Sequence, residues 1–417
     1  MNLARQSLTA ERDERARWLE CFFVVQLIGA IVLQKLAIPL GVASLELCLP
    51  FMLAGFGVLI VRGGFAIDPI RLALFGAFLV SCLLSQLLSG AAMSGPAFLL
   101  MIALYVLMVF RLDVPEVTYF RCLNIFQTAM LAVTAVVVLQ HAIQLAASWT
   151  LWPNLDKLLP SQSLLPGYNY LQPLRYGSAF YKPNGIFFLE TSFVSQFAAL
   201  AAIIELVYFR RVLRVVAYVA LLFMLFAGTG ILVLALTAPF LAPLLPRRAL
   251  LWLGVGVAIA CVVAVASGWF AQVQDRVLEF QRPGTSGYYR FTVPFMTVVE
   301  RAGDPASILT GFGAGSTPTR DASVLTPPAK LVFEYGFVPT ILFFLFFVVS
   351  LLKSAPSMGI AVGFLMFYLF GGGSFAVPVY VVMCVLFCTL LRVPQPTANL
   401  AYTPTFPASP VRQTPSQ

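Results

Sequence analysis

A series of apolar stretches, each long enough to cross a lipid bilayer, constrains the fold of this chain more than any other feature. About 20 helical residues cross the roughly 30 Å of bilayer hydrocarbon, where backbone groups must be satisfied within the protein. About twelve candidates follow one another, at about 20–38, 43–61, 70–89, 95–110, 121–147, 185–209, 213–228, 230–245, 249–268, 331–352, 357–371 and 375–392. The two within 213–245 also fit a re-entrant pair. The sequence predicts an all-α polytopic membrane protein.

Arginine and lysine in the short loops predict how these spans are oriented. The chain is only 10% charged, against about 25% in soluble domains. With twelve spans, the basic residues of the tails and short loops fall on one side: Arg5, Arg12, Arg15, Arg17, Arg62, Arg71, Arg111, Arg121, Arg210, Arg211, Arg214, Arg247, Arg248 and Lys353. That side is expected to be cytoplasmic. It includes the tail 1–19 and the proline-rich, disordered tail 394–417. Within the transmembrane domain 20–393, the large loops 148–184 and 269–330 then face outward.

Charge and cysteine usage exclude several classes of function. The net charge of +9 is accounted for by topology, so no nucleic-acid partner is expected. All seven cysteines lie in or beside the spans, which disfavours disulfides and cysteine-bound metal. His141 is the only histidine and is expected to be packed and hydrogen-bonded, because one histidine cannot form a usual zinc site. The first apolar stretch is interpreted as a retained span, since it lacks a signal-peptide cleavage site.

The two outward loops carry most of the candidate binding residues. Arginine between membrane spans indicates an anionic partner, most plausibly a phosphate, although each arginine alone also fits a solvent-exposed charge. The candidate anion ligands are Arg175 in the first loop and Arg276, Arg282, Arg290 and Arg320 in the second. Neighbouring aromatic residues suggest a groove with faces for sugar stacking. The substrate-binding candidates are Lys182, Tyr288, Tyr289 and Gly313. Short interfacial helices are expected at 269–280 and about 288–301.

The glycine run at 311–315 (Gly-Phe-Gly-Ala-Gly) superficially resembles a phosphate-binding loop. A dinucleotide fingerprint requires a preceding strand and a following helix, so the nucleotide interpretation is rejected. Two interpretations of the run remain: a structural turn, or close backbone approach to a ligand or helix.

Two carboxyl groups near the outward ends of spans are candidate catalytic residues. Glu190 and Glu334 are costly inside apolar spans and therefore suggest function, although an ion pair that only anchors a helix would also explain either one. Each could act as a general base, with Glu190 preferred. Asp321 is a weaker third candidate. Glu46 and Glu205 fit interfacial or cytoplasmic-end positions better.

Three segments of the chain resemble the bacterial O-antigen polymerase and ligase superfamily, including Wzy-type polymerases. Residues 182–196 (KPNGIFFLETSFVSQ) are similar to the segment that opens a middle span in exopolysaccharide polymerases. Residues 228–232 (GTGIL) fall where relatives have a turn that often bears an arginine. The succession of Arg290, the glycine turn and residues 333–337 (FEYGF) is similar to the end of the family pattern. The layout covers most of the chain, but the motifs are short.

The resemblance implies a GT-C-like membrane fold and glycosyl transfer at the periplasmic face of the cell inner membrane. Its substrate would be an undecaprenyl-pyrophosphate-linked oligosaccharide, and its candidate protein partner a chain-length regulator. Arg175 and Arg290 would bind the pyrophosphate, with Arg276, Arg282 and Arg320 as auxiliaries. No metal or other cofactor is expected. The turn at Gly228 lacks the frequent arginine, and residues 325–328 hold no histidine where ligases typically have one, which favours a polymerase.

Two alternative functions remain open at this stage. A ligase would transfer the finished glycan to a lipid or protein acceptor. A transporter or flippase of lipid-linked glycans would instead be expected to carry polar residues at the middle of broken spans. The charges of this chain lie mainly in the outward loops, which counts against a transporter.

Overall fold

The protein is mostly helical, with a few short strands. The computed structural model describes residues 2–40, 43–62, 65–90, 93–152, 155–168, 170–174, 178–248, 251, 262, 265–266, 278, 281–283, 285, 287–301, 305–317, 325–370 and 374–393. The N-terminal part contains α1 (Asn2–Val32), β1 (Ala37–Leu40), β2 (Ala43–Glu46), α2 (Cys48–Arg62), β3 (Ala66–Ile67), α3 (Pro69–Ser89), α4 (Gly95–Tyr105), η1 (Val106–Val109), β4 (Phe110–Asp113) and α5 (Glu116–Ala146).

The middle of the chain is more irregular before it becomes helical again. It contains η2 (Trp149–Leu151), α6 (Leu155–Leu158), η3 (Ser161–Ser163), α7 (Thr191–Ile204), η4 (Glu205–Phe209), α8 (Val212–Met224), α9 (Gly228–Leu241) and η5 (Ala242–Leu244). The C-terminal part contains η6 (Tyr288–Thr292), α12 (Val293–Arg301), α13 (Pro305–Thr310), α15 (Pro327–Tyr335), α16 (Phe337–Ser354), α17 (Met358–Phe370), η7 (Ser374–Ala376), α18 (Pro378–Cys384), η8 (Val385–Thr389) and β5 (Leu391–Arg392).

Length and composition identify a membrane protein. Among the described helices, four are long and apolar enough to cross a bilayer: Pro69–Ser89, Glu116–Ala146, Thr191–Phe209 and Phe337–Ser354. Six shorter apolar helices accompany them, at Cys48–Arg62, Gly95–Val109, Val212–Met224, Gly228–Leu244, Met358–Phe370 and Pro378–Thr389. The predicted stretch 249–268 lies almost entirely outside the described residues.

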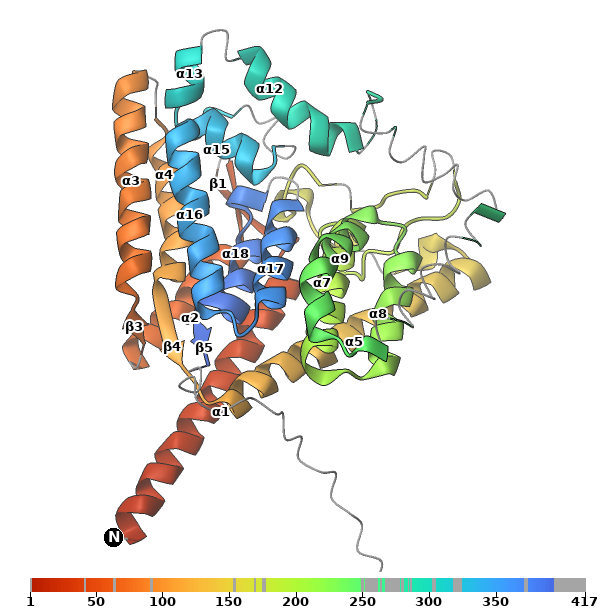
Figure 1. The fold of residues 1–417 in the computed structure, drawn as a ribbon. Coiled ribbons are helices and arrows are strands. Elements are labelled where there is room, and N and C mark those ends of the chain that lie inside the picture. Colours follow the sequence, from red (N-terminus) through yellow and green to blue (C-terminus); the bar gives the residue numbers. More distant parts are fainter. Residues whose placement is uncertain are drawn as a thin grey trace, which may run out of the picture.

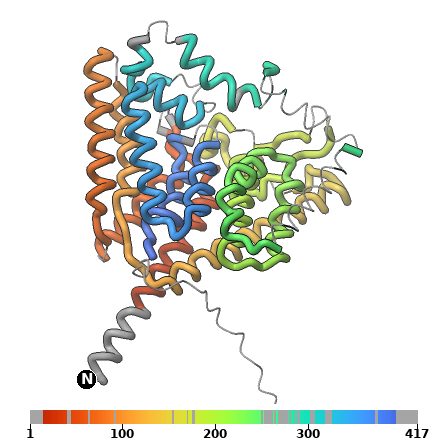
Figure 2. Tube along the Cα trace, in the orientation of Figure 1, coloured from red at the N-terminus to blue at the C-terminus, as the bar shows by residue number. Residues whose placement is uncertain are grey.

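Segments far apart in the sequence lie side by side in this bundle (Figure 2). Helices α3 and α16 pack against each other through aromatic side chains, with the rings of Phe75 and Phe346 5.1 Å apart. Helices α17 and α18 lie in the centre, between this layer and a second group formed by α7, α8 and α9 (Figure 1). We call the end of the bundle that carries β3, β4 and β5 the lower end, and the end that carries α13 and α15 the upper end.

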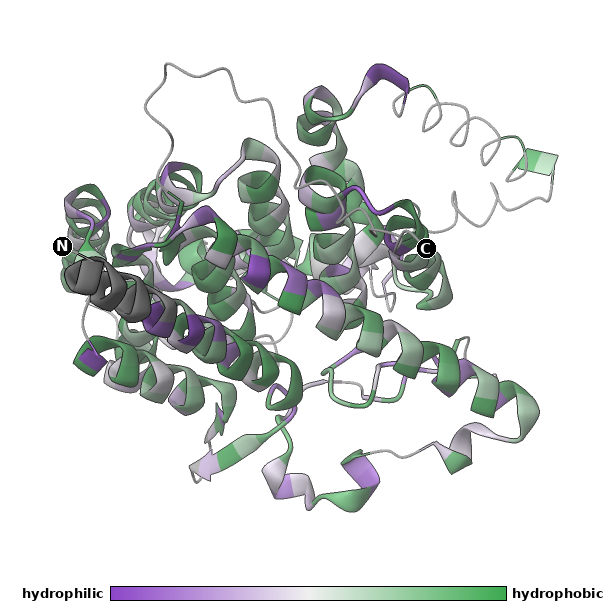
Figure 3. Cartoon of the chain, turned by 90° about the horizontal axis from the view of Figure 1, so that it is seen from below, coloured by the Kyte–Doolittle hydropathy of each residue, from purple (hydrophilic) through white to green (hydrophobic). Residues whose placement is uncertain are grey.

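Many large apolar side chains are exposed on the outside of the bundle. On α3 they include Leu83, Leu84, Leu87 and Leu88, the last two each 78% exposed. Seen from below, the helices are largely green, the colour of hydrophobic residues (Figure 3). Soluble monomers rarely expose apolar patches of this extent, so this surface fits contact with lipid.

The sequence-based prediction places the end of the first span too late in the chain. The stretch 20–38 was expected to be one helix, but α1 ends at Val32 and the chain continues into an antiparallel hairpin that pairs Ala37 with Glu46. The helix does not continue past this point. The side-chain amide of Gln34 donates to the carbonyl oxygens of Ala30 and Ile31, and so satisfies carbonyl groups at the helix end. Proline at position 39 also favours extended backbone over helix.

The stretch 213–245 forms two helices that run the full length of α7. At the lower end, the Arg210 guanidinium donates to the Leu244 carbonyl at 3.2 Å. At the other end, the Thr229 hydroxyl donates to the carbonyl of Ser192, in the first turn of α7. The tip of the pair is therefore level with the start of α7.

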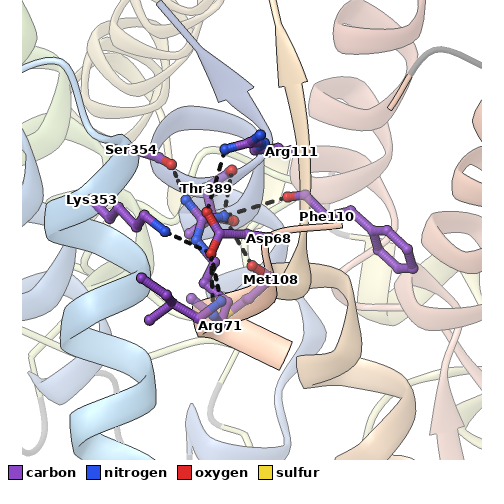
Figure 4. Close-up of polar contacts among 9 residues, drawn as sticks. Asp68, Arg71, Met108, Phe110, Arg111, Lys353, Ser354 and Thr389 are labelled. Atoms are coloured by element: carbon purple, nitrogen blue, oxygen red, sulfur yellow. Dashed lines mark hydrogen bonds and ion pairs between the residues drawn. The ribbon is translucent and has the colours of Figure 1, made fainter. Parts of the chain in front are cut away.

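A buried polar network joins four segments at the lower end (Figure 4). Asp68 caps α3, and its carboxylate accepts a 2.7 Å hydrogen bond from Lys353 and lies 3.7 Å from Arg111. Burial alone raises the pKa of Asp68, but the Lys353 hydrogen bond, the Arg71 amide and the nearby cations together hold that pKa below its ordinary value. Basic residues expected on one side of the membrane thus meet at one end of the bundle.

The buried side chain of Arg71 is the centre of this network. One guanidinium nitrogen donates to the main-chain oxygens of Met108 and Thr389 at 3.0 and 2.9 Å, and the other donates to the Ser354 hydroxyl. At the same end, β4 pairs with β3 and with β5. The network therefore fixes the start of α3 to the ends of η1, α16 and η8.

Candidate functional site

Glu190 begins α7 at the upper end of the bundle and is only 6% exposed. The Ser192 hydroxyl donates to its Oε2 at 3.2 Å. The segment before it is held by two glutamine side chains, since the Gly185 amide donates to Gln140 Oε1 and the Leu189 amide to Gln34 Oε1, each at 3.2 Å. Glu190 is therefore a buried acid on a firmly positioned backbone.

The backbone just before Glu190 is strained. Ile186 has a φ of 68°, next to Gly185 at 64°. A β-branched residue is a true outlier in this left-handed region. Conformations of this kind cost on the order of 1–3 kcal/mol and concentrate at functional sites. The strain supports a role for this segment beyond packing.

The turn at 228–230 packs directly on the first two turns of α7. The Ser195 hydroxyl donates to the Ala227 carbonyl at 3.1 Å and accepts from the Gly230 amide at 3.0 Å. A Cβ at Gly230 would lie 2.1 Å from the Ser195 carbonyl oxygen, so only glycine permits this approach. The residues that resemble the family turn thus support the helix that Glu190 begins.

Glu334 is the second buried acid at the upper end, on α15, and is 3% exposed. The Thr317 hydroxyl donates to its Oε1 at 2.7 Å, and Lys330, one helical turn earlier, lies 3.8 Å from the same oxygen. These two contacts, from a half-buried threonine and a lysine that is 12% exposed, position the Glu334 carboxylate.

The glycine run is a turn that binds the end of α15. The amides of Phe312 and Gly313 donate to the carbonyls of Phe333 and Glu334 at 2.8 and 3.1 Å. Gly311 and Gly336 have φ values of 72° and 86°, and a Cβ on Gly311 would lie 2.6 Å from the Gly336 amide nitrogen. Of the two interpretations left open by the sequence, the contacts show close backbone approach, and the partner is a helix.

A small cavity lies beside Glu334. It has a volume of about 70 Å³ and is lined by residues of α4, the glycine turn, α15 and η7, among them Met101, Lys330, Glu334 and Phe375. Its lining includes the charged residues Lys330 and Glu334, but most of its accessible surface is apolar.

A second polar cluster surrounds the end of α1. Lys35 is fully buried, with its ammonium 3.6 Å from Asp156 Oδ1 and 4.9 Å from the centre of the Tyr170 ring. Burial lowers the pKa of Lys35 to about 8, against the opposing effect of Asp156. Glu46, expected at an interface, is instead 5% exposed, and burial raises its pKa well above the ordinary value. This cluster holds the first large loop onto the hairpin.

The helix that carries Arg290 packs over the upper end of the bundle. Residues 288–301 are helical, as predicted, and form η6 and α12. The Phe291 ring lies 5.9 Å from the ring of Phe370, the last residue of α17, and α12 contacts α15. Figure 1 shows α12 above the bundle, beside α13. The backbone of Arg290 is thus at the same end as Glu190 and Glu334.

The other predicted site residues are described to different degrees. Arg282 is exposed in a turn, the Tyr288 hydroxyl donates to Met296 Sδ at 3.6 Å, and the Lys182 amide donates to the Gln172 carbonyl at 2.8 Å. Arg290 and Tyr289 are described by their backbone alone. Four predicted residues lie outside the described residues: Arg175, Arg276, Arg320 and Asp321. The predicted interfacial helix 269–280 also lies outside them, except for Leu278.

The remaining predictions for buried residues have clear structural outcomes. His141 is packed and hydrogen-bonded, as expected, with Nε2 2.9 Å from the Met224 carbonyl oxygen. Glu205 is at the lower end, where Arg211 donates to both of its carboxylate oxygens at 2.6 and 2.9 Å. Sequence reasoning missed Lys35. A lysine within an apolar stretch is itself a functional signal and could have identified Lys35.

Comparison with known proteins gives no relative: no family model matches the chain, and no curated protein or solved structure matches it.

Proposed function

We propose that this protein is a membrane polysaccharide polymerase, a glycosyltransferase that joins undecaprenyl-pyrophosphate-linked oligosaccharide repeat units. The observation that carries the proposal is the position of two buried acids, Glu190 and Glu334, at the end of the bundle over which the Arg290 helix packs. Buried acids suit proton transfer, and arginine suits phosphate. The family resemblance of these same segments connects the two chemistries in one reaction.

The proposed topology has about twelve spans in the cell inner membrane, in a GT-C-like arrangement. The lower end carries Arg71, Arg111, Arg211 and Lys353, so the positive-inside rule makes it cytoplasmic together with both termini. The upper end, with the loops 148–184 and 269–330, then faces the periplasm, where lipid-linked repeat units would meet it.

The proposed reaction is a direct displacement at the anomeric carbon of the donor sugar. The acceptor hydroxyl oxygen forms the new bond to that carbon while the bond from the carbon to the pyrophosphate oxygen breaks. Glu190 takes the proton of the acceptor hydroxyl, and Arg290 and Arg175 stabilise the negative charge on the leaving undecaprenyl pyrophosphate. By analogy with oxyanion-hole donors, each arginine would contribute on the order of 10²- to 10³-fold in rate. Direct attack inverts the anomeric configuration.

Reconstitution in liposomes with a lipid-linked repeat unit tests the proposal. A ladder of lengthened lipid-linked products is expected from the wild type, and Arg290→Ala should abolish it without loss of protein. Arg62→Ala is the matched control, because Arg62 is an exposed arginine at the lower end of α2, and its ladder should be unchanged. Transfer only to an added lipid acceptor would indicate a ligase. Movement of intact substrate across the bilayer without new bonds would indicate a transporter, and either result would refute the polymerase.

A further inference from the structure

The turn between η4 and α8 lies at the lower end of the bundle (Figure 1) and brings together arginines from two segments of the chain. One segment is the turn itself with the start of α8, and the other follows η5. The Arg210 guanidinium donates to the Leu244 carbonyl at 3.2 Å, which holds the two segments side by side. We call the five arginines of these segments the corner cluster: Arg210, Arg211, Arg214, Arg247 and Arg248.

The positive charge of the corner cluster is mostly uncompensated. Arg211 donates to both carboxylate oxygens of Glu205, at 2.6 and 2.9 Å. Within the part of the chain that the structure describes, the other four arginines pair with no carboxylate. Elsewhere at the lower end, Arg111 and Lys353 share the carboxylate of Asp68. Arginines gathered without a counter-ion fit the binding of phosphate, which their planar guanidinium groups match in geometry.

The start of α8 adds to this preference for an anion. The helix begins at Val212, its first turn contains no acidic residue, and the side chain of Arg211 at the cap position makes no capping hydrogen bond. The N-terminus of a helix carries partial positive charge, which favours anions and disfavours cations. Arg211 and Arg214 therefore lie where the dipole of their own helix repels them, and a bound anion would interact favourably with both charges and with the helix.

Exposed apolar side chains beside the arginines indicate that the anion belongs to a lipid. Val212 and Leu213, which lie between two of the arginines in the sequence, are 72% and 85% exposed, and Leu244 is 38% exposed. The corner cluster also lies at the ends of the apolar helices Val212–Met224 and Gly228–Leu244, which is the depth of lipid headgroups. A soluble anion would leave these side chains in water, whereas a phospholipid covers them with its acyl chains.

We propose that the corner cluster binds the phosphate group of an anionic phospholipid, whose acyl chains contact Val212 and Leu213. The lipid comes from the leaflet at the lower end, which is the cytoplasmic leaflet in the proposed topology. Arg211 stays bonded to Glu205 and positions the turn, while the other arginines of the cluster hold the headgroup. The bound lipid joins the start of α8 to the segment after η5. This site depends on the membrane location of the protein and not on the proposed glycosyl transfer.

Native mass spectrometry of the full chain in detergent micelles tests the lipid site. The probes are phosphatidylglycerol, phosphatidylcholine with the same acyl chains, and glycerol 1-phosphate, which has the headgroup chemistry without acyl chains. Phosphatidylglycerol should bind at least about 25-fold more tightly than phosphatidylcholine, the equivalent of two arginines at about fivefold each. Equal binding of the two lipids would overturn the proposal. Glycerol 1-phosphate that binds as tightly as phosphatidylglycerol would assign the cluster to a soluble anion and overturn the lipid.

Two variants with equal loss of charge connect this preference to the corner cluster. Arg247→Gln should weaken the binding of phosphatidylglycerol about fivefold and leave that of phosphatidylcholine unchanged. Arg62→Gln is the matched control, because Arg62 is an exposed arginine at the lower end of α2; it should change either affinity by less than about twofold. Equal losses in both variants would show a diffuse charge effect and refute the site. A glutamate-rich peptide that binds more tightly than phosphatidylglycerol would assign the cluster to an acidic protein partner and refute it as well.

Discussion

Replacement of Arg71 by methionine should destabilise the protein strongly, although it leaves the upper end untouched. Arg71 is 0% exposed and donates to the Met108 and Thr389 carbonyls and to the Ser354 hydroxyl. Methionine fills a similar volume, so the loss is mainly polar: two main-chain oxygens lose their donor. Breaking a buried charged network by removing one partner costs about 3–5 kcal/mol, a large part of the roughly 5–15 kcal/mol that stabilises a typical protein.

Thermal unfolding in detergent micelles, followed by intrinsic fluorescence, measures this loss. With about 2 °C per kcal/mol for a large domain, the midpoint for Arg71→Met should fall by about 6 °C or more. Arg62→Met, an exposed arginine on the adjacent helix, should change it by less than about 1 °C. Arg71→Lys should fall between the two, because it keeps the charge and loses the planar fork. A midpoint for Arg71→Met that matches Arg62→Met would refute the structural role of the network.

Three further predictions concern the upper end. As the pH rises from 7 to 9, the wild type should gain about 1 kcal/mol of unfolding free energy relative to Lys35→Met. Burial lowers the folded-state pKa of Lys35 to about 8, so the folded chain releases this proton before the unfolded chain does; parallel pH profiles in chemical denaturation would contradict this. Gly230→Ala should destabilise α7 and lower the thermal midpoint by several degrees, because its Cβ would lie 2.1 Å from the Ser195 carbonyl oxygen; an unchanged midpoint would show that the helices can separate freely. Glu190→Gln should reduce kcat on the order of 10²- to 10³-fold, with little change in substrate binding, if this residue is the general base; a wild-type kcat would exclude that role.

The mostly helical, apolar character of the chain could be predicted from the sequence, because it depends on local composition. The helix at 288–301 and the packed histidine His141 follow from similar local patterns. The end of the first span could not be predicted from hydropathy, since the position of Lys35 is decided by Asp156 and Tyr170, more than 100 residues later in the chain. A lysine with such partners can leave a helix and still remain buried.

The candidate site shows the same division between local and long-range information. The sequence identified Glu190 and Glu334 because an acid in an apolar segment is conspicuous by itself. It left the glycine run open between two interpretations, since the choice depends on how Gly311 approaches Gly336 across the fold.

The bond from Arg71 to Thr389 joins residues 318 positions apart in the sequence, and this has a consequence for biosynthesis. The first quarter of the chain enters the membrane long before η8 is synthesised. Before η8 is synthesised, the Arg71 guanidinium lacks one of its carbonyl acceptors, the Thr389 oxygen. The strand β4 likewise lacks its pairing with β5. The contacts of the lower end can therefore be completed only when the chain has been synthesised as far as Thr389 and β5.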